Sequence, residues 1–562
     1  MVEDLKFYNK TERPWVGNRL TNAAIVGHTT PTSARIWVRA WEEDKNEDGV
    51  SDDGEGRYWL MITEQPIDAT GQPEIRKSGG WPRVFIGGTE VPTKALHSIS
   101  LKFESDLTGV VDVDGLDPGR RYYYALFAGF ERSQRWEVGN EDLLSFKTFP
   151  AEADHLSFGV FSCHQPFKGA DIVRSEMWSA FYEALTAADA SYVIGAGDQV
   201  YVDGVKTADI WRWLRKFKDD ERLKDREARR ECMDSWYRDI YRGFWGHCNL
   251  RRVLAAFPTY MIWDDHEIMD GWGSLTQTEG VQAKLSRNPG PRGAYYQGLM
   301  RSMFEAAQRI YLEYQHGHNP RTPAGEWDYA FTAGPVVTYV LDGRGHRDFA
   351  AKAGERVLGS DQLARFLQWL ESSAARRAAA VFVVCAVPLI HHRGWIVNRF
   401  DKGGLKDDLR DQWEHDSNRR ERRRILEAVG RFSERAGTPV VFLSGDVHMS
   451  AAFRLARKGA QKARIYQLTT SGITYSGKAR VPSIPILGDR LGDYVVPDDG
   501  YVAGTGKSWF FEGLQEVVEQ QNFALAHVTI RPGGGVDLAW DLYGAAGGEP
   551  SGVIRYPRVE LD

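Results

Sequence analysis

The chain contains 562 residues, of which 42% are hydrophobic and 26% charged, and its formal net charge is −6. These proportions are typical of a globular protein, and the length predicts two or three domains. Because the small negative charge is spread over a long chain, the composition gives no reason to expect a nucleic acid or an anionic membrane as the partner.

The N-terminal residues and the cysteines bear on the cellular compartment. The first residues show neither the apolar core of a signal peptide nor a twin arginine, and no run approaches the roughly 18 apolar residues of a transmembrane helix. We therefore expect a cytoplasmic protein as the chain is given, or a periplasmic or secreted one if a leader was removed. The four cysteines are too scattered for a disulfide framework, so Cys163 and Cys385, which lie in strand-like runs, are expected to be reduced thiols. No oligomeric state is predicted.

Residues 1–150 form the first predicted domain. From about residue 20, hydrophobic and polar residues alternate with period two, for example in RYWLMIT at 57–63. Alternation without a helical period predicts an antiparallel β-sandwich. The turn LDPGR at 116–120, before a strand rich in tyrosine, is typical of the fibronectin type. The first domain is therefore expected to be a fibronectin- or Ig-like β-sandwich.

An acidic loop at residues 44–55 lies between two of these strands. Its acidic and glycine positions match the spacing of a calcium-binding loop. Because no helical pattern flanks the loop, the prediction is a structural Ca²⁺ site in a β-hairpin, far from catalysis; a solvated acidic loop is the alternative. The ligands would be Asp44, Asn46, Asp48, Val50, Asp52 and Glu55.

Residues 151–562 form the second predicted domain, in which strands alternate with loops and amphipathic helices. This order predicts an α/β domain built on two packed sheets or one wide sheet. A late Gly-turned hairpin at 523–544 is expected to extend a sheet edge. The expected strands are 156–162, 191–196, 258–263, 336–341, 380–387, 439–444 and 464–469, and the expected helices are 174–187, 207–243, 361–377 and 417–435.

Four groups of polar residues directly follow apolar runs that predict buried strands. The carboxyl ends of neighbouring strands meet at one edge of an open α/β sheet, which is where ligand sites form. Acids, imidazoles, a thiol and a phenol at one edge indicate metal binding, and their spacing suggests two metals that share one carboxylate. The groups are Ser162–His164, Gly197–Tyr201, Asp264–Glu267 and Gly445–His448.

Asp198 is the expected shared ligand, because a carboxylate after a glycine at a strand end can turn both oxygens out of the sheet. Tyr201 and Cys163 would add a phenolate and a thiolate, a pair that suits ferric iron better than zinc. Carboxylates and water at the second position suit Ca²⁺, Mg²⁺ or Mn²⁺. Zinc stays an alternative because it also accepts Cys and His. Taken singly, each residue could instead be a helix cap or a buried polar group.

The motifs FSCHQP, GDQVYVD, WDDHEI, LDGRGHRD and SGDVHMS together resemble those of the PhoD-like (alkaline phosphatase D) metallophosphoesterases, a branch of the calcineurin-like superfamily. The resemblance implies a four-layer α/β/β/α metallophosphatase domain. It also implies a two-metal site, with Fe³⁺ and Ca²⁺, that hydrolyses phosphate esters. The implied ligands are Cys163, Asp198, Tyr201 and His448 for the iron, and Asp198, Asp446 and Asp265 for the second ion.

Three departures from the family pattern leave ligands open. His164 is inserted after the cysteine and is an additional candidate ligand. Many members carry two asparagines after DDHE, whereas this chain has Asp270, so either Asp265 or Asp270 is expected at the second metal. One of the tandem histidines, His391 and His392, lies where the superfamily often has a further metal ligand.

His266, Asp264 and Arg344 are the expected catalytic groups. His266 would protonate the leaving oxygen or hold a phosphoryl oxygen, and Asp264 or Glu267 would orient its ring. Arg344 would add a bidentate contact to phosphate, or would instead pair with an acid of its own motif, LDGRGHRD.

The leading hypothesis is metal-dependent hydrolysis of a small-molecule phosphate ester, as a phosphodiesterase or an alkaline phosphomonoesterase, by a hydroxide that two metals activate. One alternative is phospholipase D-like or phosphotriester hydrolysis at the same site, because a fold alone does not set the substrate. The other is a catalytically inert binding protein. No nucleic-acid-binding domain is evident.

Overall fold

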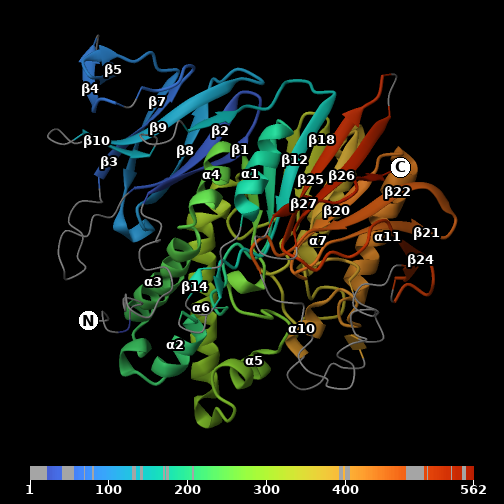
Figure 1. Cartoon of the computed structure of the whole chain (residues 1–562). Helices are drawn as coiled ribbons and strands as arrows, with labels where there is room; N and C mark the ends of the chain where they lie inside the picture. Colours follow the sequence, from blue (N-terminus) through green and yellow to red (C-terminus); the bar gives the residue numbers. More distant parts are fainter. Residues whose placement is uncertain are drawn as a thin grey trace.

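The structure is a computed structural model, and its N-terminal strands lie to one side of a larger unit of sheets and helices (Figure 1). The predicted calcium loop, Asp44 to Glu55, lies outside the described residues, as does His392. The described residues are 5, 22–40, 56–68, 70–78, 81–129, 134–138, 144–168, 171–172, 176–204, 208–391, 397–398, 406–475, 499–502, 504–532, 535–546 and 552–561.

The N-terminal strands form two antiparallel sheets that share one core. Along β9 every second residue, including Tyr122 and Tyr124, points into this core, while Ala125 and Phe127 point to the opposite face. That face is covered by a third, small sheet, through contacts such as Val84. The period-two pattern therefore gave the correct strands and faces. The sheets are β1 (Ala23–Thr29), β2 (Ser33–Arg39) and β8 (Thr108–Asp114); β10 (Gln134–Val138), β9 (Arg121–Gly129), β3 (Gly56–Thr63) and β7 (Ala95–Leu101), with β11 (Ser145–Lys147) beside β9; and β4 (Pro73–Ser78), β5 (Trp81–Ile86) and β6 (Thr89–Glu90).

Two larger mixed sheets carry the rest of the chain; the parallel strands lie at one edge of the first sheet and in the centre of the second. The first has the order β16 (Thr259–Ile262), β15 (Tyr192–Ala196), β12 (His155–Phe161), β25 (Asn522–Ile530), β26 (Val536–Ala545) and β27 (Val553–Arg555), with β28 (Val559–Leu561) beside β26. The second has the order β17 (Tyr329–Ala333), β18 (Val336–Val340), β19 (Ala380–Val384), β20 (Val440–Ser444), β22 (Ala460–Thr469), β21 (Ala451–Arg457), β24 (Trp509–Gly513) and β23 (Asp499–Tyr501).

The two mixed sheets share a core, and helices lie beside them (Figure 1). Between the sheets, the rings of Phe158 and Phe382 meet edge to face at 4.9 Å. Helix α1 (Met177–Ala187) packs beside the first sheet, α4 (Cys248–Ala256) packs against α1 and β1, and α7 (Gly359–Leu370) and α11 (Arg419–Ala436) pack beside the second sheet. The remaining elements are α2 (Ile210–Phe217), α3 (Arg226–Phe244), α5 (Gln277–Lys284), α6 (Gly293–Tyr314), α8 (Ser373–Arg377), α10 (Lys406–Asp411) and the short hairpin of β13 (Phe167–Lys168) and β14 (Asp171–Ile172).

The predicted mixed α/β class and the predicted strands of the second region are confirmed, and the late hairpin of β25 and β26 extends the sheet beyond β12. Cys163 and Cys385 are free thiols, as predicted. The fibronectin- or Ig-like type, the four-layer order and the domain boundaries remain predictions. None of the helices in the described part of the chain combines the length and apolar character that a transmembrane segment requires.

The single helix predicted over 207–243 is wrong, because the chain breaks between α2 and α3. The side chains of Asp220 and Asp225 accept hydrogen bonds from the backbone N–H groups of Arg222 and Ala228, and each therefore starts a new helical segment. The helix predicted over 361–377 likewise divides into α7 and α8, because Ser372 caps the second. Helix α6, the longest of those described, was not predicted at all.

A buried ionic cluster joins the N-terminal sheets to α3 and α6. Asp106 accepts hydrogen bonds from Arg39 of β2, Arg242 of α3 and the hydroxyl of Tyr314 at the end of α6. Burial alone would raise the pKa of Asp106, but Arg242 and Arg39 outweigh it and hold that pKa below its usual range.

We expect Asp106→Ala to lower the free energy of unfolding by about 3–5 kcal/mol, because two guanidiniums would remain buried without their partner. Since the folded pKa is depressed, the contribution of Asp106 is present above pH ~4 and is lost as the pH falls below it. Urea unfolding at neutral pH measures the effect. The matched control is Asp117→Ala, which removes an exposed pairing with Lys94. Equal losses for the two variants would contradict this account.

Candidate metal centre

The candidate centre lies where the carboxyl ends of strands from both mixed sheets meet. Cys163 follows β12, Asp198 follows β15, and Asp446 follows β20 of the other sheet. The sheets approach so closely that a Cβ atom at Gly445 would lie 2.5 Å from Ser162 Cβ and 2.6 Å from a backbone oxygen of β15. A glycine is therefore required at this point, and the glycine before Asp446 brings the two sets of ligands together.

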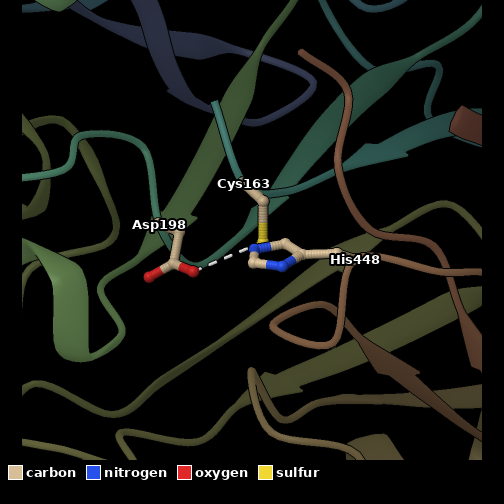
Figure 2. Close-up of side chains that lie close together, drawn as sticks. All are labelled: Cys163, Asp198 and His448. Carbon is tan, nitrogen blue, oxygen red and sulfur yellow. Dashed lines mark hydrogen bonds between the residues drawn. The ribbon is translucent and has the colours of Figure 1, made fainter. Parts of the chain in front are cut away.

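The first group contains a thiol, a carboxylate, a phenol and an imidazole. Figure 2 shows the side chains of Cys163, Asp198 and His448 converging, and their ligand atoms lie within 4.8 Å of one another. Cys163 Sγ is 3.3 Å from Asp198 Oδ2, and the hydroxyl of Tyr201 is 3.2 Å from the same oxygen and 3.1 Å from His448 Nε2. The structure thus brings together the four residues expected at an iron site.

The second group is made of carboxylates only. Asp198, Asp264, Asp265 and Asp446 offer ligand oxygens within 4.8 Å of one another, and Asp198 belongs to both groups. Asp198 Oδ1, Asp264 Oδ2 and Asp265 Oδ1 are buried and have no hydrogen-bond partner among the described residues. Buried oxygens without donors are costly unless a cation or water satisfies them. The donor set therefore fits a hard cation such as Ca²⁺, Mg²⁺ or Mn²⁺.

The pKa values of the clustered residues also favour a bound cation. Burial raises the pKa of Asp198 well above its usual value, and the charges of Asp265 and Asp264 add to this effect. Burial raises the pKa of Asp446 in the same way and that of Asp264 to about 7. Burial lowers the pKa of His448 to about 3, so its ring is neutral and its nitrogen is free to act as a ligand. A cation would stabilise the ionised acids, which burial and mutual repulsion otherwise disfavour.

Backbone strain is concentrated at these residues. Cys163, Asp198, Asp446 and His448 have φ values of 55°, 57°, 65° and 55°, in the left-handed region that non-glycine residues rarely occupy. Such strained residues persist where the surrounding structure fixes them, and they gather at functional sites.

His266 has a ring nitrogen within 4.8 Å of carboxylate oxygens of Asp198 and Asp265, and its orienting partner was predicted wrongly. Its Nδ1 lies 2.8 Å from Asp203 Oδ1, not against Asp264 or Glu267. Burial alone would lower the pKa of His266, but Asp265 and Asp203 outweigh it and raise that pKa well above its usual value. Glu267 instead accepts the backbone N–H groups of Asp198 and Gln199, and so holds the ligand loop. Asp203 is the last residue of the motif GDQVYVD, and this position was the sequence signal for its role at the site.

Arg344 does not reach the open face of the centre, which corrects the prediction that it contacts phosphate. It is fully buried, its Nε donates to Asp264 Oδ1, and its Nη2 donates to Asp411 Oδ2 at 2.7 Å. Its Nη2 is also 3.7 Å from Asp265 Oδ1. The alternative prediction, that Arg344 pairs with an acid of its own motif LDGRGHRD, is also wrong, because its guanidinium pairs with Asp411 of α10. Arg344 therefore supports two carboxylates of the second group, those of Asp264 and Asp265.

Two further candidate ligands are directed elsewhere. Both ring nitrogens of His164 are engaged, Nδ1 by Trp178 Nε1 at 3.2 Å and Nε2 by the carbonyl of Phe244 at 3.0 Å, so the hypothesis of an additional ligand is wrong. Of the two alternatives at the second position, Asp265 lies in the cluster, whereas Asp270 pairs with Lys284 at 3.2 Å.

His391 is buried, and its backbone N–H donates to Glu414. It belongs to none of the ligand groups found among the described residues.

The loop after β22 contributes residues that the sequence did not reveal. Ser471 Oγ lies 3.1 Å from Cys163 Sγ and accepts the backbone N–H of His448. The ring of Tyr475 stacks on that of His448, with centroids 3.5 Å apart. No motif signalled either residue, because their roles depend on how this loop returns to the end of β12.

Comparisons with known proteins identify a family and a similar fold. The family profile described as PhoD-like phosphatase matches residues 158–483. The chain is 24% identical over 430 residues to alkaline phosphatase D of Bacillus subtilis, covering 71% of this chain and 62% of that protein. It is 23% identical over 321 residues to an uncharacterised protein of Saccharomyces cerevisiae, covering 47% and 45%. The chain thus spans less than two thirds of the length of these curated relatives.

A solved structure titled "Structure of PhoD" has the same overall fold. It superposes with a TM-score of 0.61 at 16% identity, over 95% of this chain and 89% of that chain.

Proposed function

The chain belongs to the PhoD-like phosphatase family, and from this premise we propose that it hydrolyses phosphate esters with two bound cations. The observation that carries the proposal is the convergence of two ligand groups on the shared carboxylate of Asp198, with buried oxygens that lack partners. A relative is named alkaline phosphatase D, which supports the reaction class. We further propose a β-sandwich domain over residues 1–150 and a four-layer α/β/β/α catalytic domain over 151–562.

The two groups of ligand residues offer different donor atoms, so we propose a different metal for each group. Cys163, Tyr201 and His448 would hold ferric iron together with Asp198, because thiolate and phenolate suit a highly charged ion. The carboxylate group would hold Ca²⁺ or a similar hard cation. A cation pair bound there would neutralise phosphate oxygens and acidify a nucleophilic water.

The protein's own residues complete the proposed mechanism. Asp203 fixes the ring of His266 through Nδ1, which leaves Nε2 to face the substrate. Held protonated by the surrounding acids, His266 would give its proton to the leaving oxygen. Arg344 would not touch substrate; it keeps Asp264 and Asp265 in place beneath the reacting atoms.

Hydrolysis of aryl esters tests the proposal directly. The protein is stripped with a chelator, reloaded with Fe³⁺ and Ca²⁺, and assayed with a bis-aryl phosphodiester and with its monoester. We expect activity only in the reloaded protein, and the ratio of the two rates gives the ester preference. Full activity of the stripped protein would contradict the metal requirement, and inactivity of the reloaded protein on both would favour the inert binding protein.

We expect His266→Asn to retain both metals and to lower turnover by about 10²–10⁴-fold with alkyl leaving groups, which need a proton. The loss should be much smaller with nitrophenyl esters, whose leaving group needs little acid assistance. Asp203→Asn should also lower turnover more with alkyl than with nitrophenyl leaving groups. His346→Asn, at an exposed histidine whose Nε2 lies 3.2 Å from the backbone oxygen of Gly325, is the control. Equal losses with both kinds of leaving group would rule out His266 as the acid.

A further inference from the structure

A second cluster of metal-ligating side chains lies at the opposite end of β12 from the candidate centre. Six residue steps along β12 separate His155 from Phe161, which corresponds to about 20 Å. In the antiparallel pairing of β12 with β25, Ser157 lies opposite His527, and His155 opposite Thr529. The register therefore places these four side chains on one face of the sheet.

One imidazole of this cluster is fixed by a buried carboxylate. His527 Nε2 lies 2.8 Å from Asp541 Oδ2. Both oxygens of Asp541 also accept hydrogen bonds from guanidinium groups, Oδ2 from Arg555 and both oxygens from Arg558. A carboxylate that pairs with two guanidiniums acts as an acceptor, so it takes the proton of Nε2. It follows that Nδ1 of a neutral His527 ring carries a lone pair, which faces Ser157 Oγ at 2.8 Å.

The other imidazole faces the same point. His155 Nε2 lies 2.9 Å from Ser157 Oγ, and its Nδ1 lies 3.0 Å from Thr529 Oγ1. The two rings are nearly parallel, 19° apart, with centroids separated by 6.2 Å. The ring nitrogens of two histidines thus converge on one hydroxyl, and the remaining nitrogen of each is held by an oxygen. Proteins orient metal-binding imidazoles in this way, with a carboxylate or hydroxyl on the far nitrogen.

A serine nucleophile is the competing chemistry, because Ser157, His527 and Asp541 are connected like a catalytic triad. Ser157 is buried beneath the two rings, so a substrate carbonyl has no access to its oxygen. His155, in contrast, is exposed, which opens its side of the cluster to a small ion and to water.

We propose that His155 and His527 bind a divalent transition-metal ion of the Zn²⁺ or Cu²⁺ class, with Asp541 positioning His527. Imidazole nitrogens suit these metals, and water or the hydroxyl of Ser157 would complete the coordination. Binding requires His155 to carry its proton on Nδ1, where Thr529 Oγ1 can accept it. The site is independent of the proposed hydrolytic centre, since it shares no residue with it.

Calorimetric titration of Zn²⁺ into the full chain, with its catalytic centre already loaded, tests the proposal. We expect His155→Ala to bind one equivalent fewer than the unsubstituted protein and to hydrolyse esters at the same rate. Asp541→Asn should keep the stoichiometry and weaken binding by about 10–100-fold. His97→Ala, at another strand histidine, in β7, is the control.

Cu²⁺ provides a second readout, because its electron paramagnetic resonance spectrum resolves coupling to the bound nitrogens. Two imidazole nitrogens are expected, falling to one in His155→Ala. If His155→Ala bound as many Zn²⁺ ions as the unsubstituted protein, the proposal would be overturned. Hydrolysis would be unaffected by that result, so it would leave the proposed function standing.

Discussion

Replacing Asp198 with asparagine should lower ester hydrolysis by about 10³-fold or more, equivalent to about 4 kcal/mol of transition-state stabilisation. Asp198 is the residue that belongs to both ligand groups, so its loss should remove both cations. The shape of the side chain and its hydrogen-bond acceptor remain, which keeps the contacts from Tyr201 and Cys163 possible. Elemental analysis and the hydrolytic rate measure the two effects.

The same variant should be more stable than the unsubstituted protein when both are free of metal. Burial and the neighbouring acids raise the folded pKa of Asp198, so its ionised form destabilises the metal-free fold at neutral pH. Asparagine removes that charge, and the melting temperature should rise. Asp189→Asn is a matched control, because Asp189 has a similar left-handed φ of 44° but is exposed. A metal-free Asp198→Asn protein that melts at a lower temperature would contradict the repulsion argument.

Replacing Arg344 with methionine should remove the second cation while leaving the iron in place. The guanidinium supports Asp264 directly and lies close to Asp265, but it contacts none of the iron ligands. We also expect unfolding to become easier by about 3–5 kcal/mol, since Asp264 and Asp411 would lose a buried partner. The calcium-to-iron ratio measures the first effect, and urea unfolding measures the second.

Arg365→Met separates this outcome from general damage to the domain. Arg365 also pairs with an aspartate, Asp328, but at a partly exposed position away from the centre. It should lose stability without a change in the calcium-to-iron ratio. If Arg344→Met kept both metals at full occupancy, Arg344 would have no role in holding the second group.

The strands and the convergence of the polar residues after them could be predicted because both depend on local sequence. Short apolar runs such as YVIGA before Asp198 identify buried strands, and their carboxyl ends fix where the ligands lie. The period of two along β9 similarly gave both faces of that strand. In these cases a few neighbouring residues are enough to predict the strand and its position.

The errors arose where partners come from distant parts of the chain. Arg344 meets Asp411 because α10 packs beneath the second ligand group, a placement that no local pattern encodes. His164 was assigned to metal from its position next to Cys163, yet the folded chain places Trp178 and Phe244 against its ring. Asp203 completes the motif GDQVYVD and could by sequence either support the loop or touch metal, whereas the folded chain places it 2.8 Å from His266 Nδ1.

Helix α6 was missed although its sequence contains a signal. Buried residues recur three or four apart at Tyr296, Leu299, Met303 and Ile310, which is a helical period. Two glycines near its start and the Gly/Pro-rich segment before it favoured a loop instead. Packing against α3 and α5 stabilises the helix despite these residues.

Anomalous scattering from a crystal of the active protein, recorded on both sides of the iron absorption edge, tests the central claim most directly. The account predicts a peak at the first ligand group, bonded at about 2.0–2.3 Å to the donor atoms of Cys163, Asp198, Tyr201 and His448. A second density should lie among the carboxylates of Asp198, Asp264, Asp265 and Asp446. Active protein with no metal between Asp198 and His448 would contradict it.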